Sequence, residues 1–232
     1  MPQREQVLSR RGLSILELGR VPYRETLERM RTLTASRDSA TTDQIWLLEH
    51  PPVYTLGLSS SARGAHPVIG TLASGIPIER TERGGQITYH GPGQLVAYLM
   101  LDLRRLGLGV KELVYRVEEA LIQTLASYGV DGRRRTGAPG VYVACPGGAG
   151  RFEGWAKIAA LGVRISRGCS LHGLSLNVAM DLAPFEAIDP CGYPGLRAID
   201  LAGLGVTCTR EAVGERLAER LAAHFASGPE LR

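Results

Sequence analysis

The chain has 232 residues, of which 44% are hydrophobic and 22% charged, and its formal net charge is +4. This is the composition of a globular protein long enough to bury a sizeable core, and no apolar run approaches the roughly 20 residues that span a bilayer. The small, dispersed charge gives no support for nucleic-acid binding. The polar N-terminus MPQREQVLSRRG lacks the apolar segment of a secretory signal. We therefore expect a cytoplasmic protein that binds neither nucleic acid nor membrane.

The first expected element is a helix over residues 22–36, after a frayed or strand-leading N-terminus. Pro22 suits the first turn of this helix. Apolar side chains recur on one face at helical spacing, namely Tyr23, Leu27, Met30 and Leu33. Two buried strands are then expected, at 44–50 and 53–58, with a Pro-Pro break between them.

The middle of the chain predicts a connector, two strands and a second helix. The connector is the stretch 58–80, which is rich in Gly, Ser and Pro. In 86–103 two strands are joined through the turn-forming residues HGPG. Residues 110–128 predict an amphipathic helix closed by Gly129. We interpret the basic run 133–135 that follows as a solvated loop.

The last part of the chain predicts three β-like segments and a final helix. The β-like segments are 140–144, 157–166 and 170–180. The helix is expected to begin after Thr209 as N-cap and to run to about Phe225. Helices combined with several adjacent strands, without an internal repeat or linker, predict an α/β (α+β) fold in a single domain, residues 1–232.

The four cysteines are widely separated and are Cys145, Cys169, Cys191 and Cys208. With no C-x-x-C pair they do not indicate a zinc site, and we expect free thiols and no bound metal. Cys191 differs from the others because Pro190 and Gly192 place it on a tight loop, where a thiol is accessible. Cys145, at the edge of a loop, is the second candidate nucleophile.

A nucleophilic cysteine needs a basic or cationic neighbour that favours its thiolate. Three such groups stand in β-like or glycine-rich context, namely His90, His172 and Lys157. We interpret His90 either as a residue of the site or as a structural one. His50, which precedes two prolines, is expected to be structural. His66 and His224 are expected at the surface.

Lysine is rare in this chain, because only Lys111 and Lys157 among 27 basic residues are lysines. Lys111 has a simple explanation as an exposed helix residue. Lys157 begins the apolar run KIAALGV. It is either a strand end that extends its amine to solvent or a position that needs an amine able to lose and regain its proton. Arginine cannot serve that second purpose because it stays charged at any useful pH.

Twenty-nine glycines are present, and many cluster in RGGQITYHGPGQL, CPGGAG, LHGLSLN and DPCGYPGL. Such clusters fit either a site built from backbone amides or ordinary turns. None of them matches a nucleotide phosphate-binding loop, a dinucleotide fingerprint or the G-x-S-x-G nucleophile elbow. These absences argue against ATPases, dehydrogenases and serine hydrolases, and we expect no cofactor.

Four motifs in order resemble the octanoyltransferases of lipoate biosynthesis, namely RGGQITYHGPGQLVAY, KIAALGVRIS, SLHGLSLNV and IDPCG. The similarity extends from about residue 13 to 225. It implies a mixed β-sheet flanked by helices, as in the catalytic domains of biotin and lipoate protein ligases. It also implies transfer of an octanoyl group from acyl carrier protein to a lipoyl-domain lysine. The acceptors implied are the lipoyl domains of 2-oxoacid dehydrogenase complexes and the glycine cleavage H protein.

The resemblance also implies roles for individual residues. Cys191 matches the nucleophile that carries the acyl group as a thioester, and Lys157 matches its partner in a Cys/Lys dyad. Three further segments match substrate-binding loops of the family. Their residues are Arg83, Gly84, Gly85, Gln86, Ile87, Thr88, Tyr89 and His90; Ala160, Leu161 and Gly162; and Gly173, Leu174 and Ser175.

Three other functions remain open at this point. An ATP-dependent lipoate or biotin protein ligase has the same expected fold, but it needs a way to bind phosphates and does not need Cys191. A cysteine hydrolase or thioesterase would pass the acyl group to water. A non-catalytic module that binds acyl chains or lipoyl domains would make no covalent intermediate.

Overall fold

The computed structural model describes residues 6–10, 12–60, 75–148, 150–188 and 195–226. The described helices are α1 (Tyr23–Ser36), α2 (Val110–Ala126), α3 (Ala183–Glu186) and α4 (Arg210–Phe225). The described strands are β1 (Gln6–Arg10), β2 (Leu13–Arg20), β3 (Asp43–Glu49), β4 (Val53–Leu56), β5 (Ile78–Arg80), β6 (Ile87–His90), β7 (Gln94–Met100), β8 (Arg133–Arg135), β9 (Ala138–Ala144), β10 (Trp155–Ser166), β11 (Cys169–Asn177) and β12 (Arg197–Ala198). No helix among these residues is long and apolar enough to cross a membrane.

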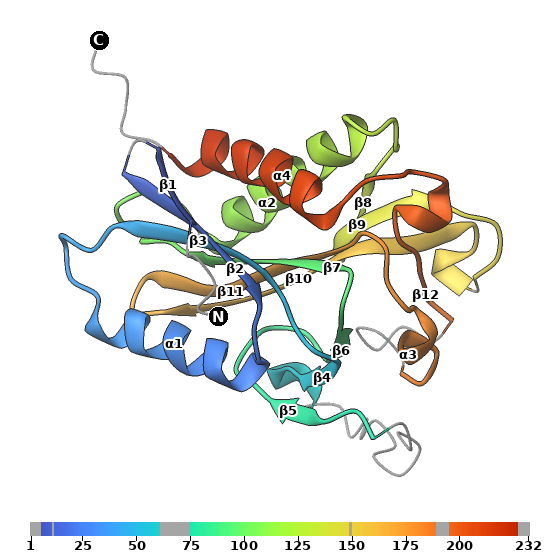
Figure 1. Ribbon diagram of the computed structural model, residues 1–232, viewed down its shortest axis with the longest axis horizontal. Coiled ribbons are helices and arrows are strands. Elements are labelled where there is room, and N and C mark those ends of the chain that lie inside the picture. The colour runs from blue at the N-terminus through green and yellow to red at the C-terminus, as the bar shows by residue number, and fades with distance from the viewer. Residues whose placement is uncertain (1–5, 11, 61–74, 149, 189–194, 227–232) are drawn as a thin grey trace.

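A large mixed sheet forms the centre of the molecule (Figure 1). Its nine described strands run in the order β1-β2-β3-β7-β11-β10-β9-β8, with β12 paired to β10. The pairs β2–β3 and β10–β12 are parallel, and the other neighbours are antiparallel. A second, three-stranded sheet has the order β5-β4-β6. The predicted α/β (α+β) fold with a mixed sheet flanked by helices is confirmed.

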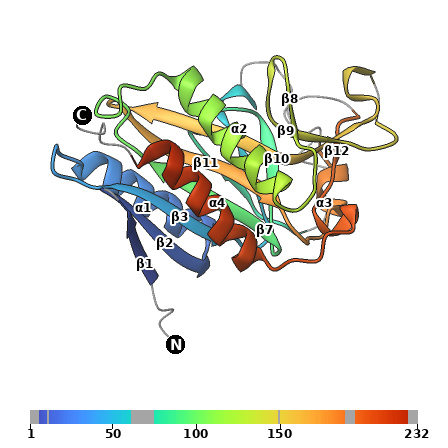
Figure 2. The same cartoon turned by 90° about the horizontal axis from the view of Figure 1, so that it is seen from above.

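Helices cover both faces of the large sheet. Helices α2 and α4 lie side by side on one face, and α1 lies on the other face together with the small sheet (Figures 1 and 2). The apolar core under α2 and α4 includes Leu121, Leu176 and Leu217. A separate cluster under α1 includes Met30 and Trp46. The three-layered arrangement follows from burying one apolar stripe of each helix against the sheet.

The three expected long helices are confirmed, with their periodicity and end signals. In α2 every fourth residue is buried over four positions, namely Leu113, Val117, Leu121 and Leu125. In α4 the Thr209 hydroxyl accepts a hydrogen bond from the Ala212 amide at 3.2 Å, which makes Thr209 the predicted N-cap. The expected Leu33 is only half-buried in α1, where Thr34 is buried instead.

Several strand expectations need correction. The run 133–135 is not a solvated loop but strand β8, which pairs with β9. The two strands joined by HGPG are confirmed, although β6 belongs to the small sheet and β7 to the large one. The expected connector 58–80 ends in strand β5, while its residues 61–74 lie outside the described part of the chain. Strand β2 was not predicted, although the buried alternation of Leu13 and Ile15 is a strand signal.

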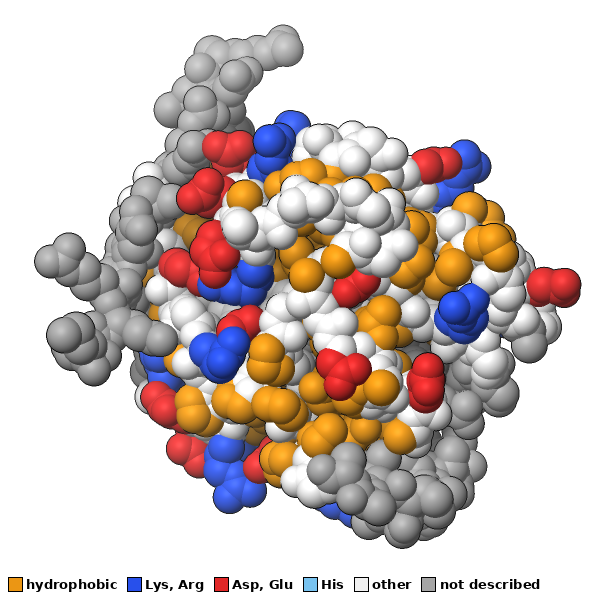
Figure 3. Space-filling view, turned by 45° about the vertical axis from the view of Figure 1, so that its right-hand side comes forward, with side chains coloured by type: hydrophobic (Ala, Val, Ile, Leu, Met, Phe, Trp, Pro, Cys, Tyr) orange, Lys and Arg blue, Asp and Glu red, His pale blue; other side chains and the backbone are white. Residues whose placement is uncertain are grey.

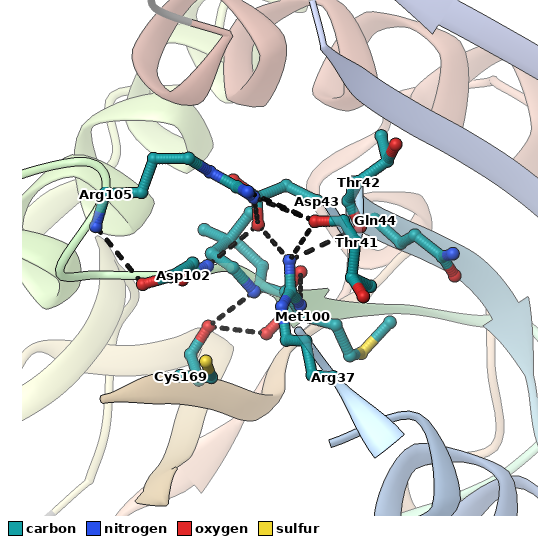
Figure 4. A network of polar contacts seen from close by, with 12 residues as sticks. Arg37, Thr41, Thr42, Asp43, Gln44, Met100, Asp102, Arg105 and Cys169 are labelled. Atoms are coloured by element: carbon teal, nitrogen blue, oxygen red, sulfur yellow. Dashed lines mark hydrogen bonds and ion pairs between the residues drawn. The ribbon is translucent and has the colours of Figure 1, made fainter. Parts of the chain in front are cut away.

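A buried ion pair ties the end of α1 to the start of β3 and the end of β7 (Figure 4). The guanidinium of Arg37 contacts the Asp43 carboxylate, and both side chains are almost fully buried. Arg37 also donates to the Met100 carbonyl at 2.9 Å. Asp43 in addition accepts from the Asp102 amide at 2.8 Å and pairs with Arg105 at 2.7 Å. The carboxylate thus has three partners from two separate segments of the chain, around Arg37 and over 102–105.

The face of the molecule seen in Figure 3 carries charges of both signs. Acidic and basic side chains lie there among apolar ones, and the described residues on this face form no broad basic area. Nucleic-acid binding relies on clustered basic side chains opposite the phosphates. This face therefore lacks the charge arrangement that such binding requires.

Candidate active site

A pocket lies where three separate segments of the chain meet. It is a narrow, partly open cavity with a volume of about 40 Å³. The three segments that match substrate-binding loops of the resembled family all contribute to its lining. Their lining residues are Arg83, Gly85, Ile87, Thr88 and His90; Ala160, Leu161 and Gly162; and Gly173, Leu174 and Ser175. Its remaining lining residues are Tyr23, Tyr98 and His172. Residues that are far apart in the sequence are thus brought to one cavity.

Strand pairing explains why these segments meet. Ala160, Leu161 and Gly162 in β10 lie opposite Ser175, Leu174 and Gly173 in β11, respectively. The 81–86 loop crosses β10, because the Gly84 amide donates to the Val163 carbonyl at 3.1 Å. A Cβ added to Gly162 would lie 3.1 Å from Arg83 Cδ and 3.2 Å from the Gly84 carbonyl oxygen. Glycine at this position therefore allows the loop to approach the sheet closely.

Not every residue of the expected segments lines this pocket. Gly84, Gln86 and Tyr89 do not. Tyr89 packs instead against Tyr54 and Phe185, at ring-centroid distances of 5.4 and 5.6 Å. In β6 the side chains alternate between the two faces, so Thr88 and Tyr89 point to opposite sides. Tyr89 thus belongs to the apolar cluster around the small sheet.

Lys157 lies beside this pocket and is buried. Its side chain lines a neighbouring cavity, and Thr88, Ala160 and Ser175 line both cavities. Lys157 is only 6% exposed, and its Nζ donates to the Pro139 carbonyl at 3.2 Å. The interpretation of Lys157 as a strand end extending into solvent is therefore wrong. An amine at this position is held inside the protein.

The neighbour of Lys157 on β9 is fixed by a buried carboxylate. Glu118 of α2 is 7% exposed, accepts from the Gly140 amide at 2.9 Å and pairs with Arg134 at 3.1 Å. Gly140 adjoins Pro139, whose carbonyl accepts from Lys157. The basic run 133–135 thus has a structural purpose, because Arg134 holds the carboxylate that positions β9. The sequence offered no indication that Glu118, Arg134 and Gly140 contact one another, because they belong to three separate elements.

Replacing Gly140 by alanine is expected to displace Lys157. Gly140 has φ +133°, and its added Cβ would lie 2.7 Å from the Ala159 carbonyl oxygen and 3.2 Å from Lys157 Nζ. We expect a loss of about 1–3 kcal/mol in the free energy of unfolding and, because misplacement by about 1 Å can cost about 100-fold, a marked loss of turnover. Urea unfolding and steady-state kinetics measure the two effects.

Gly137→Ala is the matched control. Gly137 also has a positive φ, +70°, but a Cβ there would meet nothing within 4 Å. It should lose stability without a comparable loss of turnover per folded molecule. Equal turnover of the two variants would contradict a role of Gly140 in placing Lys157.

Cys191 lies outside the described residues, but the chain that follows its segment does not. In β12, Ala198 pairs with Lys157, and the Ile199 amide donates to the Lys157 carbonyl at 3.1 Å. Leu196, Arg197 and Ala198 line the Lys157 cavity. The first described residues after position 191 therefore reach the immediate surroundings of Lys157.

The other three cysteines are free thiols, as expected, and lie elsewhere. Cys169 is buried at the start of β11, and Cys208 is half-buried with a thiol pKa raised by burial. Cys145 is half-buried and lines neither the pocket nor the Lys157 cavity. The second candidate nucleophile therefore does not contribute to the lining of either cavity.

Three histidines are buried, of which His90 and His172 line the pocket and His50 packs against His90. His50 is structural, as expected, with its ring nitrogens 2.8 Å from the Val21 carbonyl oxygen and 2.8 Å from the Tyr98 hydroxyl. His90 contacts Gln94 Oε1 at 2.7 Å, and burial lowers its pKa to about 3, with His50 as the next cause. Burial also lowers the pKa of His172 to about 4. All three rings are neutral at pH 7.

The two remaining histidines and Lys111 are not among the described residues that line the pocket. His66 lies outside the described residues. His224 is half-buried in the last turn of α4 rather than fully at the surface. Lys111, in contrast, is exposed on α2 as expected.

Comparison with known proteins gives both close and distant relatives. The family model described as the lipoyl protein ligase A/B catalytic domain matches residues 22–222. The chain is 54% identical over 211 residues to an octanoyltransferase of Paraburkholderia phytofirmans, covering 91% of this chain and 86% of the relative. It is 51% identical over 208 residues to an octanoyltransferase of Polynucleobacter asymbioticus, covering 89% and 95%.

Solved structures share the fold at low sequence identity. A bipartite lipoate protein ligase of Thermoplasma acidophilum matches with a TM-score of 0.67 and 16% identity, over 90% of this chain and 82% of that one. A biotin protein ligase of Aquifex aeolicus matches with a TM-score of 0.54 and 15% identity, over 91% and 69%. These two likenesses concern the fold alone.

Proposed function

The chain belongs to the lipoyl protein ligase A/B catalytic-domain family, and on this premise we propose that it is an octanoyltransferase that carries the acyl group on Cys191. The observation that carries the proposal is a buried lysine beside a pocket, in a chain 54% identical to an octanoyltransferase. The donor is octanoyl-acyl carrier protein and the acceptor is a lysine of an apo lipoyl domain. The whole chain acts as one domain.

The first half-reaction is a thioester exchange. The Cys191 thiolate attacks the acyl carbonyl carbon, the bond from that carbon to the carrier sulfur breaks, and the carrier thiol leaves with a proton from Lys157. One thioester replaces another, so the step needs no ATP and no cofactor. The ammonium of Lys157 also favours the thiolate over the thiol before attack. The pairing of Ala198 with Lys157 supports this assignment, because it brings the chain after position 191 to the lysine.

The second half-reaction is an aminolysis. The acceptor amine attacks the acyl-enzyme carbonyl carbon, the bond to the Cys191 sulfur breaks, and an amide forms. Lys157 takes the proton that the amine loses. It can do so because the thiolate has gone and burial disfavours the charged amine. The two groups titrate as a coupled pair, and the role of Lys157 alternates between acid and base.

The acyl chain occupies the pocket lined by the three segments. Ile87, Leu161 and Leu174 contribute apolar walls to it. Thr88, Ala160 and Ser175 connect it with the Lys157 cavity, so a chain attached beside Lys157 can extend into it. Backbone amides of the glycine-rich segments are candidates for stabilising the oxyanion of the tetrahedral intermediates.

Intact-mass spectrometry tests the proposal. Incubation with octanoyl-acyl carrier protein should add one octanoyl group to the protein, and Cys191→Ser should abolish that adduct. Cys145→Ser is the matched control and should acquire the adduct normally. Addition of an apo lipoyl domain without ATP should then remove the adduct and octanoylate the domain.

Other results would point to the alternative functions. An absolute ATP requirement would favour a lipoate or biotin ligase, whose fold this chain shares. Release of free octanoate without an acceptor would favour a thioesterase. Tight binding of the lipoyl domain with no adduct in any variant would favour a non-catalytic module.

A further inference from the structure

The deep end of the pocket is polar, although its walls near Leu161 and Leu174 are apolar. Gly85 is exposed and Leu161 and Gly162 are half-buried, so they lie toward the mouth. Apart from Ser175, which also lines the Lys157 cavity, the buried lining residues with polar side chains are Tyr23, Arg83, His90, Tyr98 and His172, none more than 7% exposed. An acyl chain that enters from the Lys157 side therefore ends against polar, mostly aromatic side chains.

Three of these five side chains are satisfied by the protein. Arg83 donates to the Thr55 carbonyl at 2.6 Å, and His90 contacts Gln94 at 2.7 Å. The Tyr98 hydroxyl lies 2.8 Å from a ring nitrogen of His50. These groups have no need of a partner in the pocket.

The other two side chains have polar atoms that lack a well-placed partner. Within the described part of the chain His172 Nδ1 is buried and makes no hydrogen bond, and the buried Tyr23 hydroxyl makes none of good geometry and has the Thr81 hydroxyl beside it. Thr81 lies near both, with its hydroxyl 3.5 Å from His172 Nε2. We call Tyr23, Thr81 and His172 the polar floor. Buried polar atoms of this kind are normally matched by ordered water.

The backbone of His172 is strained in a way that places its ring in the pocket. Gly173 and Ser175 line the pocket, while Leu174 and Leu176 also belong to the core under α2 and α4. Strict alternation along β11 would turn His172 toward that core. Its φ of +61° breaks the alternation, and the ring packs edge-on against Tyr98 at 6.0 Å. A non-glycine residue at such a φ is uncommon and persists only where the surroundings require it.

The polar floor is chemically suited to water and unsuited to a hydrocarbon. A neutral imidazole has one donor and one acceptor nitrogen, and a phenol can donate and accept. Contact with a methyl group leaves these atoms unsatisfied, whereas water satisfies them. Desolvating such an atom without a partner disfavours binding by about tenfold or more.

We propose that the polar floor of Tyr23, Thr81 and His172 retains water at the end of the acyl pocket and thereby sets the upper limit on acyl chain length. The inference rests on the proposed octanoyl transfer. A chain that stops short of the floor leaves the water in place. A longer chain must displace that water, which leaves His172 Nδ1 without a partner and the Tyr23 hydroxyl with Thr81 alone. These residues therefore determine specificity without taking part in the chemistry.

Competition between chain lengths tests the proposal. The kcat/KM values for octanoyl-, decanoyl- and dodecanoyl-carrier protein are measured with each variant. Tyr23→Phe removes the hydroxyl and keeps the ring, so the decanoyl-to-octanoyl ratio should rise about tenfold. A ratio within one variant is independent of the fraction of enzyme that is folded. Tyr128→Phe is the matched control, because its hydroxyl is also buried, has the Arg216 side chain beside it without a hydrogen bond of good geometry, and lies outside the pocket. Its ratio should equal that of the wild type.

A second variant keeps the test decisive if Tyr23→Phe folds poorly. Asparagine tolerates a positive φ, so His172→Asn removes the ring with little backbone strain and should also raise the decanoyl-to-octanoyl ratio. An unchanged ratio in both variants would overturn the polar floor. Absence of any octanoyl transfer by the wild type would instead overturn the proposed function, so the two failures are distinguishable.

Discussion

Lys157→Arg should still form the acyl-enzyme but should transfer the acyl group to a lipoyl domain at least about 100-fold more slowly. Arginine keeps its positive charge, so it can favour the thiolate and assist departure of the carrier thiol. It cannot accept a proton from the incoming amine at neutral pH. The second half-reaction should therefore become rate-limiting, and the acyl-enzyme should accumulate. Single-turnover experiments followed by intact-mass spectrometry separate the two half-reactions.

The chain contains its own control for this substitution. Lys111 is the other lysine and is exposed on α2, so Lys111→Arg should change neither half-reaction. A third variant, Lys157→Met, has an unbranched side chain only one atom shorter but removes the charge, and it should slow acyl-enzyme formation as well. Wild-type turnover by Lys157→Arg would rule out alternation of the lysine between acid and base.

The largest expected effect on stability is that of Asp43→Asn. The Arg37 and Asp43 side chains are 4% and 6% exposed, and Asp43 also pairs with Arg105 at 2.7 Å. Removing the carboxylate charge leaves the Arg37 guanidinium buried without its counter-charge. Breaking a buried pair in this way costs about 3–5 kcal/mol. Urea unfolding followed by circular dichroism should show a lower transition midpoint with little change in its slope.

The matched control is a surface pair of the same residue types. Asp131 and Arg133 are 73% and 62% exposed and lie 2.7 Å apart. Because exposed pairs contribute about 0–1 kcal/mol, Asp131→Asn should leave the midpoint nearly unchanged. A similar loss in both variants would mean that burial does not govern the contribution of the Arg37–Asp43 pair.

The helices of this protein could be predicted from its sequence because their signals are local. The apolar residues of α2 and α4 recur at the spacing of one helical face, and Thr209 caps α4 through its own side chain. The sheet could not be assigned in the same way. Strands β6 and β7 are separated only by a short turn, yet they pair with different partners. Strand partners are set by distant segments, so local pattern alone did not separate them.

In the candidate site, too, the types of reactive residue could be predicted from the sequence, whereas their positions in space could not. The rarity of lysine and the Pro–Cys–Gly context singled out Lys157 and Cys191 from residue chemistry alone, and the family resemblance assigned them roles. The burial of Lys157, the support of β9 by Glu118 and Arg134, and the poorly satisfied polar atoms of Tyr23 and His172 had no sequence signal. Each of these features depends on contacts between segments far apart in the chain.

By itself the sequence determined the class of fold, the long helices and the residue types available for thioester chemistry, because these depend on periodicity and on functional groups. Only the tertiary structure decided that Lys157 is enclosed rather than solvated and that three glycine-rich segments line one pocket. It also decided that the backbone of β11 turns His172 into that pocket. Burial, proximity and backbone handedness arise from packing against other segments.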